Sequence, residues 1–408
     1  MFICTMRCAA LLMLLRGSPA VAEGLTEREV LRQFLEQSPQ ARELRARTAA
    51  LKAELQTRSL FPNPSVSYSR ESAGFTEFFE AQQALPINGR LGYLKKATVA
   101  AASASEADAR FTLWGLRCDV RAAFHALVRA QVRGSALQQA IDEIGKVIRI
   151  LAEREKEGEG SKYDRLRAER EAVELRAELA VAETLTIQAR SNLLAYLPGG
   201  LPGNNDAKEA SGSLAVPPPV PADQLLALAL RARGDYRVEE DQIRRYQLEQ
   251  SAASRLRFPD PVFSAGLKRA DSGRGDVVNG PVVTLSVPLP IFNRGAAEVQ
   301  RFQAEELRAR ARRDGLLQQI TAQVEGAYQT LAVRRRAADA YAAAITSGGT
   351  ELTRIAQVAY QEGELGILEL LDALRVNRQS QLRLLDLQAS AREAQIELER
   401  VVGEEIEK

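Results

Sequence analysis

The feature that most constrains this chain is an internal duplication, because a repeated layout limits the folds that the whole sequence can adopt. The stretch "FPNP" at 61–64 ends a helical run and starts a strand-like alternation, and "FPDP" at 258–261 does the same in the second half. Prolines at these positions stop a helix and impose extended geometry on the residues before them. Proline is tolerated at the first residue of a strand, where no ladder donor is needed yet. Each junction is therefore predicted to convert a helix directly into a strand.

The segments that follow each junction also repeat. Two strand-like runs separated by a polar turn end at "LPINGR" (85–90) in the first half and at "VPLPIFNRG" (287–295) in the second. A long helical segment then begins in each half, and each would be roughly 100 Å long if continuous. These segments break at "EGEGS" and "EGELG", and a return helix follows each break. The sequence therefore predicts a helix, a β-hairpin and a long helical hairpin, written twice.

The domain boundaries follow from this plan and from composition. The N-terminus has a basic residue, a short apolar run and a small-x-small ending at Ala22, the pattern of an export signal that is too short to span a membrane. The segment between the halves is too rich in Gly, Pro and Ser to be helical. We assign a signal peptide at 1–22, a first repeat at 23–198 (β-hairpin 64–86, helical hairpin 91–197), a linker at 199–221, and a second repeat at 222–408 (β-hairpin 261–289, helical hairpin 295–402).

Composition argues against several functions. The formal net charge is only +2 and charges of both signs are interspersed. This charge pattern does not indicate a protein that binds nucleic acid. After removal of the signal peptide only Cys118 would remain, so the mature chain has no internal disulfide. His125, the single histidine, is interpreted as a packing or surface residue. We find no nucleophile with a histidine partner, no phosphate-binding loop and no metal-ligand cluster, and we predict a protein that is not an enzyme and has no cofactor.

The strands alternate between an apolar and a polar face. Val283, Leu285 and Val287 share one face, as do Phe263, Ala265 and Leu267 in the preceding strand. This pattern is typical of a membrane-spanning barrel strand, but a two-sided sheet in a soluble domain fits it equally well. Because an open sheet edge is not tolerated in lipid and the smallest such barrels have eight strands, about four strands per chain would require several copies to share one barrel. The return helix supports assembly, since it carries a coiled-coil stripe: Leu371, Leu374, Leu382, Leu385, Ala389 and Ile396.

In the order and spacing of these features the chain resembles the outer membrane efflux family, the TolC-like proteins, over essentially its whole mature length. The exit "VPLPIFNRG" and the shortness of the chain look most like the branch that serves heavy-metal cation exporters. The resemblance implies a mainly α fold with a small β part: duplicated helical hairpins in a trimeric α-barrel, and four strands per protomer in a shared 12-stranded outer-membrane β-barrel. It implies a passive exit duct in the outer membrane of a Gram-negative bacterium, with a periplasmic helical tunnel.

The resemblance also implies partners and site residues. The partners are two further copies in a homotrimer, a periplasmic adaptor (membrane fusion) protein, an inner-membrane efflux transporter of the RND type, and outer-membrane lipid. The pore entrance and its gate fall at Glu369, Asp372, Asp164 and Tyr360. The tips that contact the adaptor fall at Gly158, Gly160, Ser161, Gly363, Leu365 and Gly366. A basic residue that helps closure in some relatives would fall at Leu365, which indicates that the closed state here is held differently.

Two other interpretations stay open at this point. A periplasmic coiled-coil adaptor predicts one helical hairpin flanked by halves of a β domain, and a coiled-coil scaffold predicts no pore. Glu369 and Asp372 could be ordinary solvated charges, and Asp164 could serve only the helix dipole in its first turn.

Overall fold

The structure, a computed structural model, describes residues 25–71, 75–201, 209–218, 220–271, 276–346 and 349–406. The segment assigned to the signal peptide lies outside these residues. The elements in chain order are α1 (Glu27–Gln37), α2 (Pro39–Thr57), β1 (Ser65–Glu71), β2 (Thr76–Ala84), α3 (Arg90–Glu157), α4 (Lys162–Leu194), α5 (Ala222–Ala232), α6 (Gly234–Ser254), the 3₁₀ turn η1 (Arg255–Arg257), β3 (Val262–Asp271), β4 (Val277–Ser286), α7 (Ala296–Thr346), α8 (Gly349–Gln361) and α9 (Ile367–Val402).

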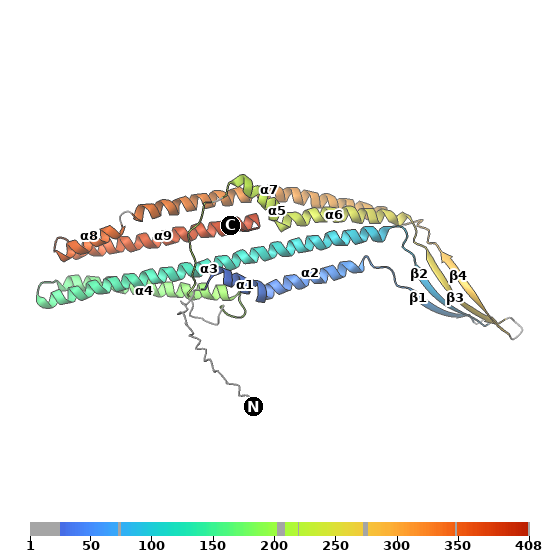
Figure 1. The fold of residues 1–408 in the computed structure, drawn as a ribbon, viewed down its shortest axis with the longest axis horizontal. Helices are drawn as coiled ribbons and strands as arrows, with labels where there is room; N and C mark the ends of the chain where they lie inside the picture. The colour runs from blue at the N-terminus through green and yellow to red at the C-terminus, as the bar shows by residue number, and fades with distance from the viewer. Residues whose placement is uncertain are drawn as a thin grey trace, which may run out of the picture.

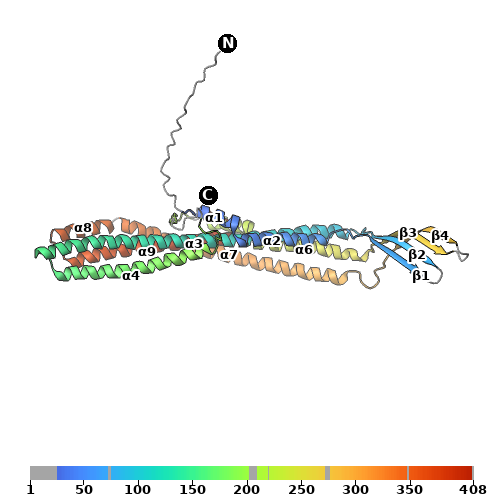
Figure 2. The same ribbon diagram turned by 90° about the horizontal axis from the view of Figure 1, so that it is seen from below.

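The molecule is a long, narrow rod with the four strands at one end (Figures 1 and 2). At the other end lie the two turns that connect α3 to α4 and α8 to α9. The longest helix is α3, whose 68 residues run from the sheet to the turn that leads into α4. Nearest the sheet, α2, α3, α6 and α7 pack side by side, and toward the turns α4, α3, α9 and the α7–α8 segment do so. Short helices α1 and α5 lie near the middle of the rod, which we call the waist.

The four strands form one antiparallel sheet in the order β1-β2-β3-β4. The two hairpins therefore meet through β2 and β3, where Phe79 lies opposite Leu267. Within the described part of the chain no strand lies beyond β1 or β4, so both are edges. None of the described helices is long and apolar enough to cross a membrane.

Both long helices begin with the same local device after the strands. Asn88 Oδ1 accepts a hydrogen bond from the Arg90 backbone N–H at 2.9 Å, and Gly89 has a φ of 78°. In the second half Asn293 Oδ1 accepts from the Gly295 N–H at 2.9 Å, and Gly295 has a φ of 80°. Glycine adopts this left-handed conformation without steric cost. The motifs "NGR" and "NRG" are therefore matching helix starts.

The second long helical segment, expected to run over 295–361, is described in two parts. These are α7, which ends at Thr346, and α8, which begins at Gly349. Residues 347 and 348 between them lie outside the described residues.

The helices are held together by apolar clusters along the rod. Toward the turns, α3, α4, α8 and α9 bury a cluster that includes Leu137, Leu175 and Leu370. At the waist a second cluster combines α1, α3 and the end of α4 with Leu201 and Leu214 of the linker. Near the sheet α3 packs with small residues instead, which lets neighbouring backbones approach closely: Ala97, Ala100, Ala101, Ala104 and Ala107 are all buried.

Candidate functional site

The two turns at the helical end of the rod have the same backbone geometry. Gly158 and Gly363 have φ values of 79° and 78°. In the first turn the N–H groups of Glu159 and Gly160 both donate to the Arg154 carbonyl, at 2.9 and 3.0 Å. In the second turn the two residues after Gly363 donate in the same way to the Ala359 carbonyl. The turns therefore present two equivalent tips at one end of the molecule.

The helices that leave the tips are capped differently. Ser161 caps α4, because its side chain accepts a hydrogen bond from the Tyr163 N–H at 3.1 Å. Gly366 occupies the corresponding position before α9 and makes no side-chain cap. A Cβ on Gly160 would lie 2.8 Å from the Glu155 backbone nitrogen, so this position is restricted to glycine by close approach. Leu365 packs against the apolar cluster of α3, α4, α8 and α9.

The four residues assigned to a gate fall into two groups. Glu369 and Asp372 lie on the first turns of α9, are exposed, and have no ion-pair partner among the described residues. Burial raises the pKa of Tyr360, the charge of Arg154 opposes this shift, and the negative charge of Asp164 adds to it. Tyr360 of α8 and Asp164 of α4 are therefore near enough for their charges to interact. It places the two acidic residues of α9 on open surface.

Arg154 at the end of α3 joins this second group. Its guanidinium carbon lies 5.5 Å from the centre of the Tyr360 ring, and its Nη2 donates to the Gln361 carbonyl at 3.2 Å. A guanidinium over an aromatic face is attractive. Arg154 thus supplies a basic group that links the end of α3 to the end of α8. Leu365, the position at which some relatives carry a basic residue, does not supply one.

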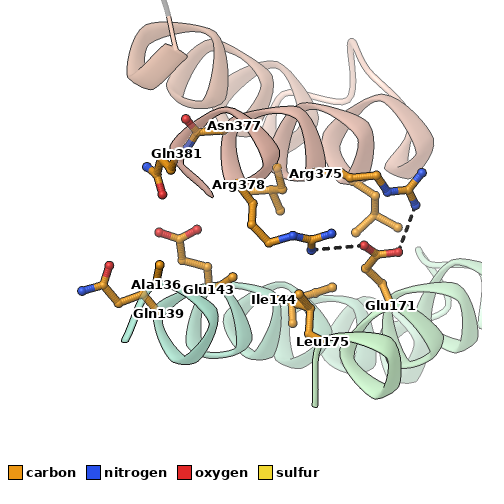
Figure 3. A pocket seen from close by; sticks show the side chains of 13 residues that line it. Ala136, Gln139, Glu143, Ile144, Glu171, Leu175, Arg375, Asn377, Arg378 and Gln381 are labelled. Carbon is orange, nitrogen blue, oxygen red and sulfur yellow. Dashed lines mark hydrogen bonds and ion pairs between the residues drawn. The ribbon is translucent and has the colours of Figure 1, made fainter. Parts of the chain in front are cut away.

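A polar link between the hairpins near the tips was not predicted from the sequence. Glu171 of α4 accepts from Arg375 Nη2 at 2.9 Å and from Arg378 Nη1 at 3.4 Å, both on α9 (Figure 3). Arg378 also lies 3.9 Å from Glu178. The side chains of Glu171 and Arg378 are 15% and 12% exposed. We call Glu171, Arg375 and Arg378 the hairpin clamp.

The clamp borders a small polar cavity of about 60 Å³ between α3, α4 and α9. Burial favours the neutral form of Glu171, but the hydrogen bond and charge of Arg375, with the charge of Arg378, lower its pKa below the usual value. Glu171 is therefore ionised at neutral pH. The spacing of Arg375 and Arg378, one turn apart, was visible in the sequence, but their partner lies 204 and 207 positions away.

A second buried charge network lies at the waist. Arg121 of α3 forms ion pairs with Glu27 of α1 and with Glu399 of α9, whose side chain is fully buried. His125 Nε2 lies 2.9 Å from Glu27 Oε2. Burial would raise the pKa of Glu27, but the His125 hydrogen bond and the Arg121 charge lower it to about 2. His125, interpreted as a packing or surface residue, is thus a buried residue that helps hold α1 on α3.

The sheet at the opposite end has one apolar and one polar face. Residues that pair across strands share a face, so Tyr68, Phe79, Leu267 and Pro281 form one row. The row two positions nearer the helices is also apolar: Val66, Ala81, Ala265 and Val283. The opposite face carries mostly polar and small residues: Ser65, Ser67, Glu80, Gln82, Ser264, Gly266, Lys268 and Thr284. The apolar rows are solvent-exposed in the single chain.

Comparison with known proteins tests the resemblance to outer membrane efflux proteins. Residues 225–404 match the family model described as outer membrane efflux protein. The cobalt-zinc-cadmium resistance protein CzcC of Cupriavidus metallidurans is 26% identical over 351 residues, which cover 84% of this chain and 82% of the relative. The family model matches within the second half of the chain, and the similarity to CzcC extends over both halves. These matches confirm the resemblance to outer membrane efflux proteins and support an efflux channel of the outer membrane.

Solved structures of membrane channels share the fold of the whole rod. The open state of the MtrE outer membrane channel of Neisseria gonorrhoeae aligns with a TM-score of 0.72 at 18% identity, covering 93% of this chain and 89% of that one. The channel CusC aligns with a TM-score of 0.69 at 18% identity, covering 93% and 92%. The chain has two helical hairpins where a periplasmic adaptor is expected to have one, so the adaptor alternative is not supported.

Proposed function

We propose that three copies of this chain form one continuous duct, with a shared barrel of twelve strands in the outer membrane and a helical tunnel in the periplasm. The observation that carries the proposal is the two-faced sheet whose edges, β1 and β4, have no neighbour in the described chain. An apolar face of this kind suits lipid, and unpaired edges do not. Closure by β1 of one copy against β4 of the next satisfies both requirements.

The helices next to these edges support the same closure. The outer helices of the rod are α2 and α4 on one side and α7 with α8 on the other. The α7 helix exposes a stripe of small and aliphatic residues at spacings of three, four and eleven: Ala304, Leu307, Ala311, Ala322 and Val333. Such a stripe packs well against a neighbouring helix. A second copy placed beside β4 would bring its α2 and α4 to this stripe.

The tip end is proposed to be the entrance of the duct. Three copies would bring Glu369 and Asp372 together as a ring of carboxylates, which attracts cations and repels anions. Tyr360, Asp164 and Arg154 lie just beside this ring and would contribute to its closed form. The hairpin clamp, a few turns along α9, holds the two hairpins of one protomer together and would resist their separation.

The tips themselves are proposed to contact a periplasmic adaptor, and through it an inner-membrane transporter of the RND type. Gly158, Gly160, Ser161, Gly363, Leu365 and Gly366 form this surface. Glycines at both turns leave the backbone accessible to the helical tips of a partner. The energy for export would come from the transporter, as the resemblance implies.

Heavy-metal cations are the proposed substrate class. Two observations support it: the similarity to a protein named for cobalt, zinc and cadmium resistance, and the acidic residues at the proposed entrance. The test is growth of a strain that lacks the protein, with and without the restored chain, in rising concentrations of Co²⁺, Zn²⁺, Cd²⁺ and a hydrophobic antibiotic. We expect the chain to restore growth against the metals. Restored growth against the antibiotic alone would contradict the metal assignment.

The acidic ring has its own test. Glu369→Gln with Asp372→Asn should reduce the cation-to-anion permeability ratio of channels in planar bilayers, because the fixed negative charge near the pore is removed. Asp339→Asn, an exposed change on α7 away from the tips, is the control. An unchanged permeability ratio in the double variant would contradict the proposed ring of carboxylates.

A further inference from the structure

The apolar face of the sheet ends in a row of polar residues at the end of the sheet away from the helices. This row is Arg70, Glu77, Arg269 and Asn279, paired across the four strands. It lies on the same face as the apolar rows because it is two positions beyond Tyr68, Phe79, Leu267 and Pro281. If the sheet crosses the membrane as proposed, this row faces lipid, and the inference below rests on that proposed function.

Two guanidinium groups in this row converge on one aromatic ring. The Arg70 guanidinium carbon lies 4.7 Å from the centre of the Phe75 ring, and that of Arg269 lies 5.6 Å from it. The two arginines come from β1 and β3, which flank β2. Stacking on an aromatic face orients a guanidinium plane and leaves its N–H groups at the edge free to bind an acceptor. Phe75 thus holds both cations in one place.

The single acid in the row does not neutralise this site. Glu77 accepts a hydrogen bond from the Tyr68 hydroxyl at 2.9 Å and lies 3.8 Å from Arg269 Nη1. Its side chain is only 12% exposed, whereas that of Arg269 is 53% exposed. The carboxylate is therefore largely covered, and the surface that the row presents outward is positive.

The depth of the row matches a membrane surface. Along β3, Arg269 lies eight positions beyond Pro261, the residue at which the strand leaves the helical junction. Eight positions correspond to about 26 Å along the strand. For a tilted strand this length spans about 20 Å of the membrane thickness. The apolar band of an outer-membrane barrel is about 25 Å tall. The junction end of the band is marked by exposed apolar residues: Phe61, Ile87, Phe258, Ile291 and Phe292. The arginine row therefore falls at the opposite headgroup layer, which faces the outside of the cell.

We propose that Arg70 and Arg269, held by Phe75, form a binding site for the phosphate of a phosphorylated lipid in the outer leaflet. Arginine binds phosphate in a bidentate manner, and a site at headgroup depth reaches a lipid phosphate without burying an unpaired charge. With three copies, three such sites would surround the barrel. They would fix the depth of the barrel and bind the lipids around it.

The experiment uses the full chain, purified in detergent and reconstituted into phosphatidylcholine vesicles. Flotation with the vesicles is measured first, because a wild-type protein that does not insert refutes the membrane-spanning sheet itself and the lipid site with it. Inserted protein is then titrated with bisphosphorylated lipid A, with the same lipid after removal of its phosphates, and with inorganic phosphate. Binding is followed by native mass spectrometry and by the apparent unfolding temperature.

We expect the bisphosphorylated lipid to bind and to raise the unfolding temperature, and the dephosphorylated lipid to bind at least tenfold more weakly. Arg70→Gln and Arg269→Gln should each weaken binding by about tenfold, the scale of one lost charge-assisted hydrogen bond. Arg70→Lys with Arg269→Lys, which retains the charge but not the bidentate geometry, should fall in between. Lys268→Gln, one position away on the opposite face of β3, is the matched control and should bind like the wild type.

Three results would overturn the site. The arginine variants could insert and bind the phosphorylated lipid as tightly as the wild type. The lipid without phosphates could bind equally well, which would assign the affinity to the acyl chains. Inorganic phosphate at the same concentration could give the same stabilisation, which would mean a general anion effect that does not need a lipid.

Discussion

The hairpin clamp makes the sharpest prediction about the entrance. Glu171→Gln keeps the shape of the side chain and removes the charge that Arg375 and Arg378 share. Exposed ion pairs contribute about 0–1 kcal/mol, and removing one partner of a buried pair costs about 3–5 kcal/mol. Glu171 and Arg378 are mostly shielded while Arg375 is 44% exposed, so we expect an intermediate loss of about 1–2 kcal/mol. If opening separates α9 from α4, this loss shifts the closed-to-open equilibrium by about fivefold to thirtyfold.

The assay is single-channel recording of the purified protein in planar bilayers. The open probability of Glu171→Gln should rise in 0.1 M salt, and the difference from the wild type should shrink in 1 M salt, where ion pairs are screened. Glu174→Gln is the control, because Glu174 lies on the same helix and is 63% exposed. Among the described residues its ion-pair partner is Arg170 of its own helix. Glu171→Arg combined with Arg375→Glu and Arg378→Glu should restore closure. Equal open probabilities in the wild type and Glu171→Gln at low salt would refute the clamp as a determinant of the closed state.

Further predictions concern the stability of the rod, each followed by thermal unfolding of the detergent-solubilised protein. Because the pKa of Glu27 falls from 4.5 to about 2 on folding, its ionised form should stabilise the fold above about pH 4.5, and this stabilisation should be lost as the pH falls toward 2. The effect is below about 3 kcal/mol, since the side chain is 25% exposed. A wild type that is no more acid-sensitive than Glu27→Gln would contradict this prediction. Gly234→Ala should destabilise the protein by about 2 kcal/mol or more, since the new Cβ would lie 2.2 Å from a carbonyl oxygen of α3. Gly145→Ala, whose Cβ would have nothing within 4 Å, should stabilise it by about 0.5–1 kcal/mol. Equal unfolding temperatures of the two variants would refute the close contact at Gly234. Arg121→Met should cost about 3–5 kcal/mol because it removes the cationic partner of the buried Glu399 carboxylate. Arg400→Met, which breaks a partly exposed pair between the same two helices, should cost about 1 kcal/mol or less, and similar losses would show that burial does not set the difference.

The features that sequence reasoning predicted are those with a local physical signal. The Pro-flanked junctions, the strand alternation and the tip glycines each depend on the conformational limits of single residues, and the duplication made every signal appear twice. The structure has the predicted helices, the two β-hairpins and the apolar face. The apolar stripe of the return helix is buried except at Leu374, which is partly buried.

The features that escaped prediction depend on register between distant helices. Glu171 and Arg375 are ordinary charged residues of exposed helices until α4 and α9 are placed side by side. The same holds for His125 and Glu27, which meet only because α1 docks on α3. Phe75, Arg70 and Arg269 likewise come together only through the strand order. Charge patterns along one helix or strand give no information on such pairs.

The central claim is that three copies share one duct through the outer membrane. Its most direct test is the mass of the protein extracted from isolated outer membranes in mild detergent, determined by light scattering corrected for bound detergent. The account predicts three chain masses per particle, recovered from the outer-membrane fraction. A monomer or dimer, or a protein recovered from the soluble periplasm, would contradict the account. It would mean that the sheet does not form part of a shared barrel with its apolar face toward lipid.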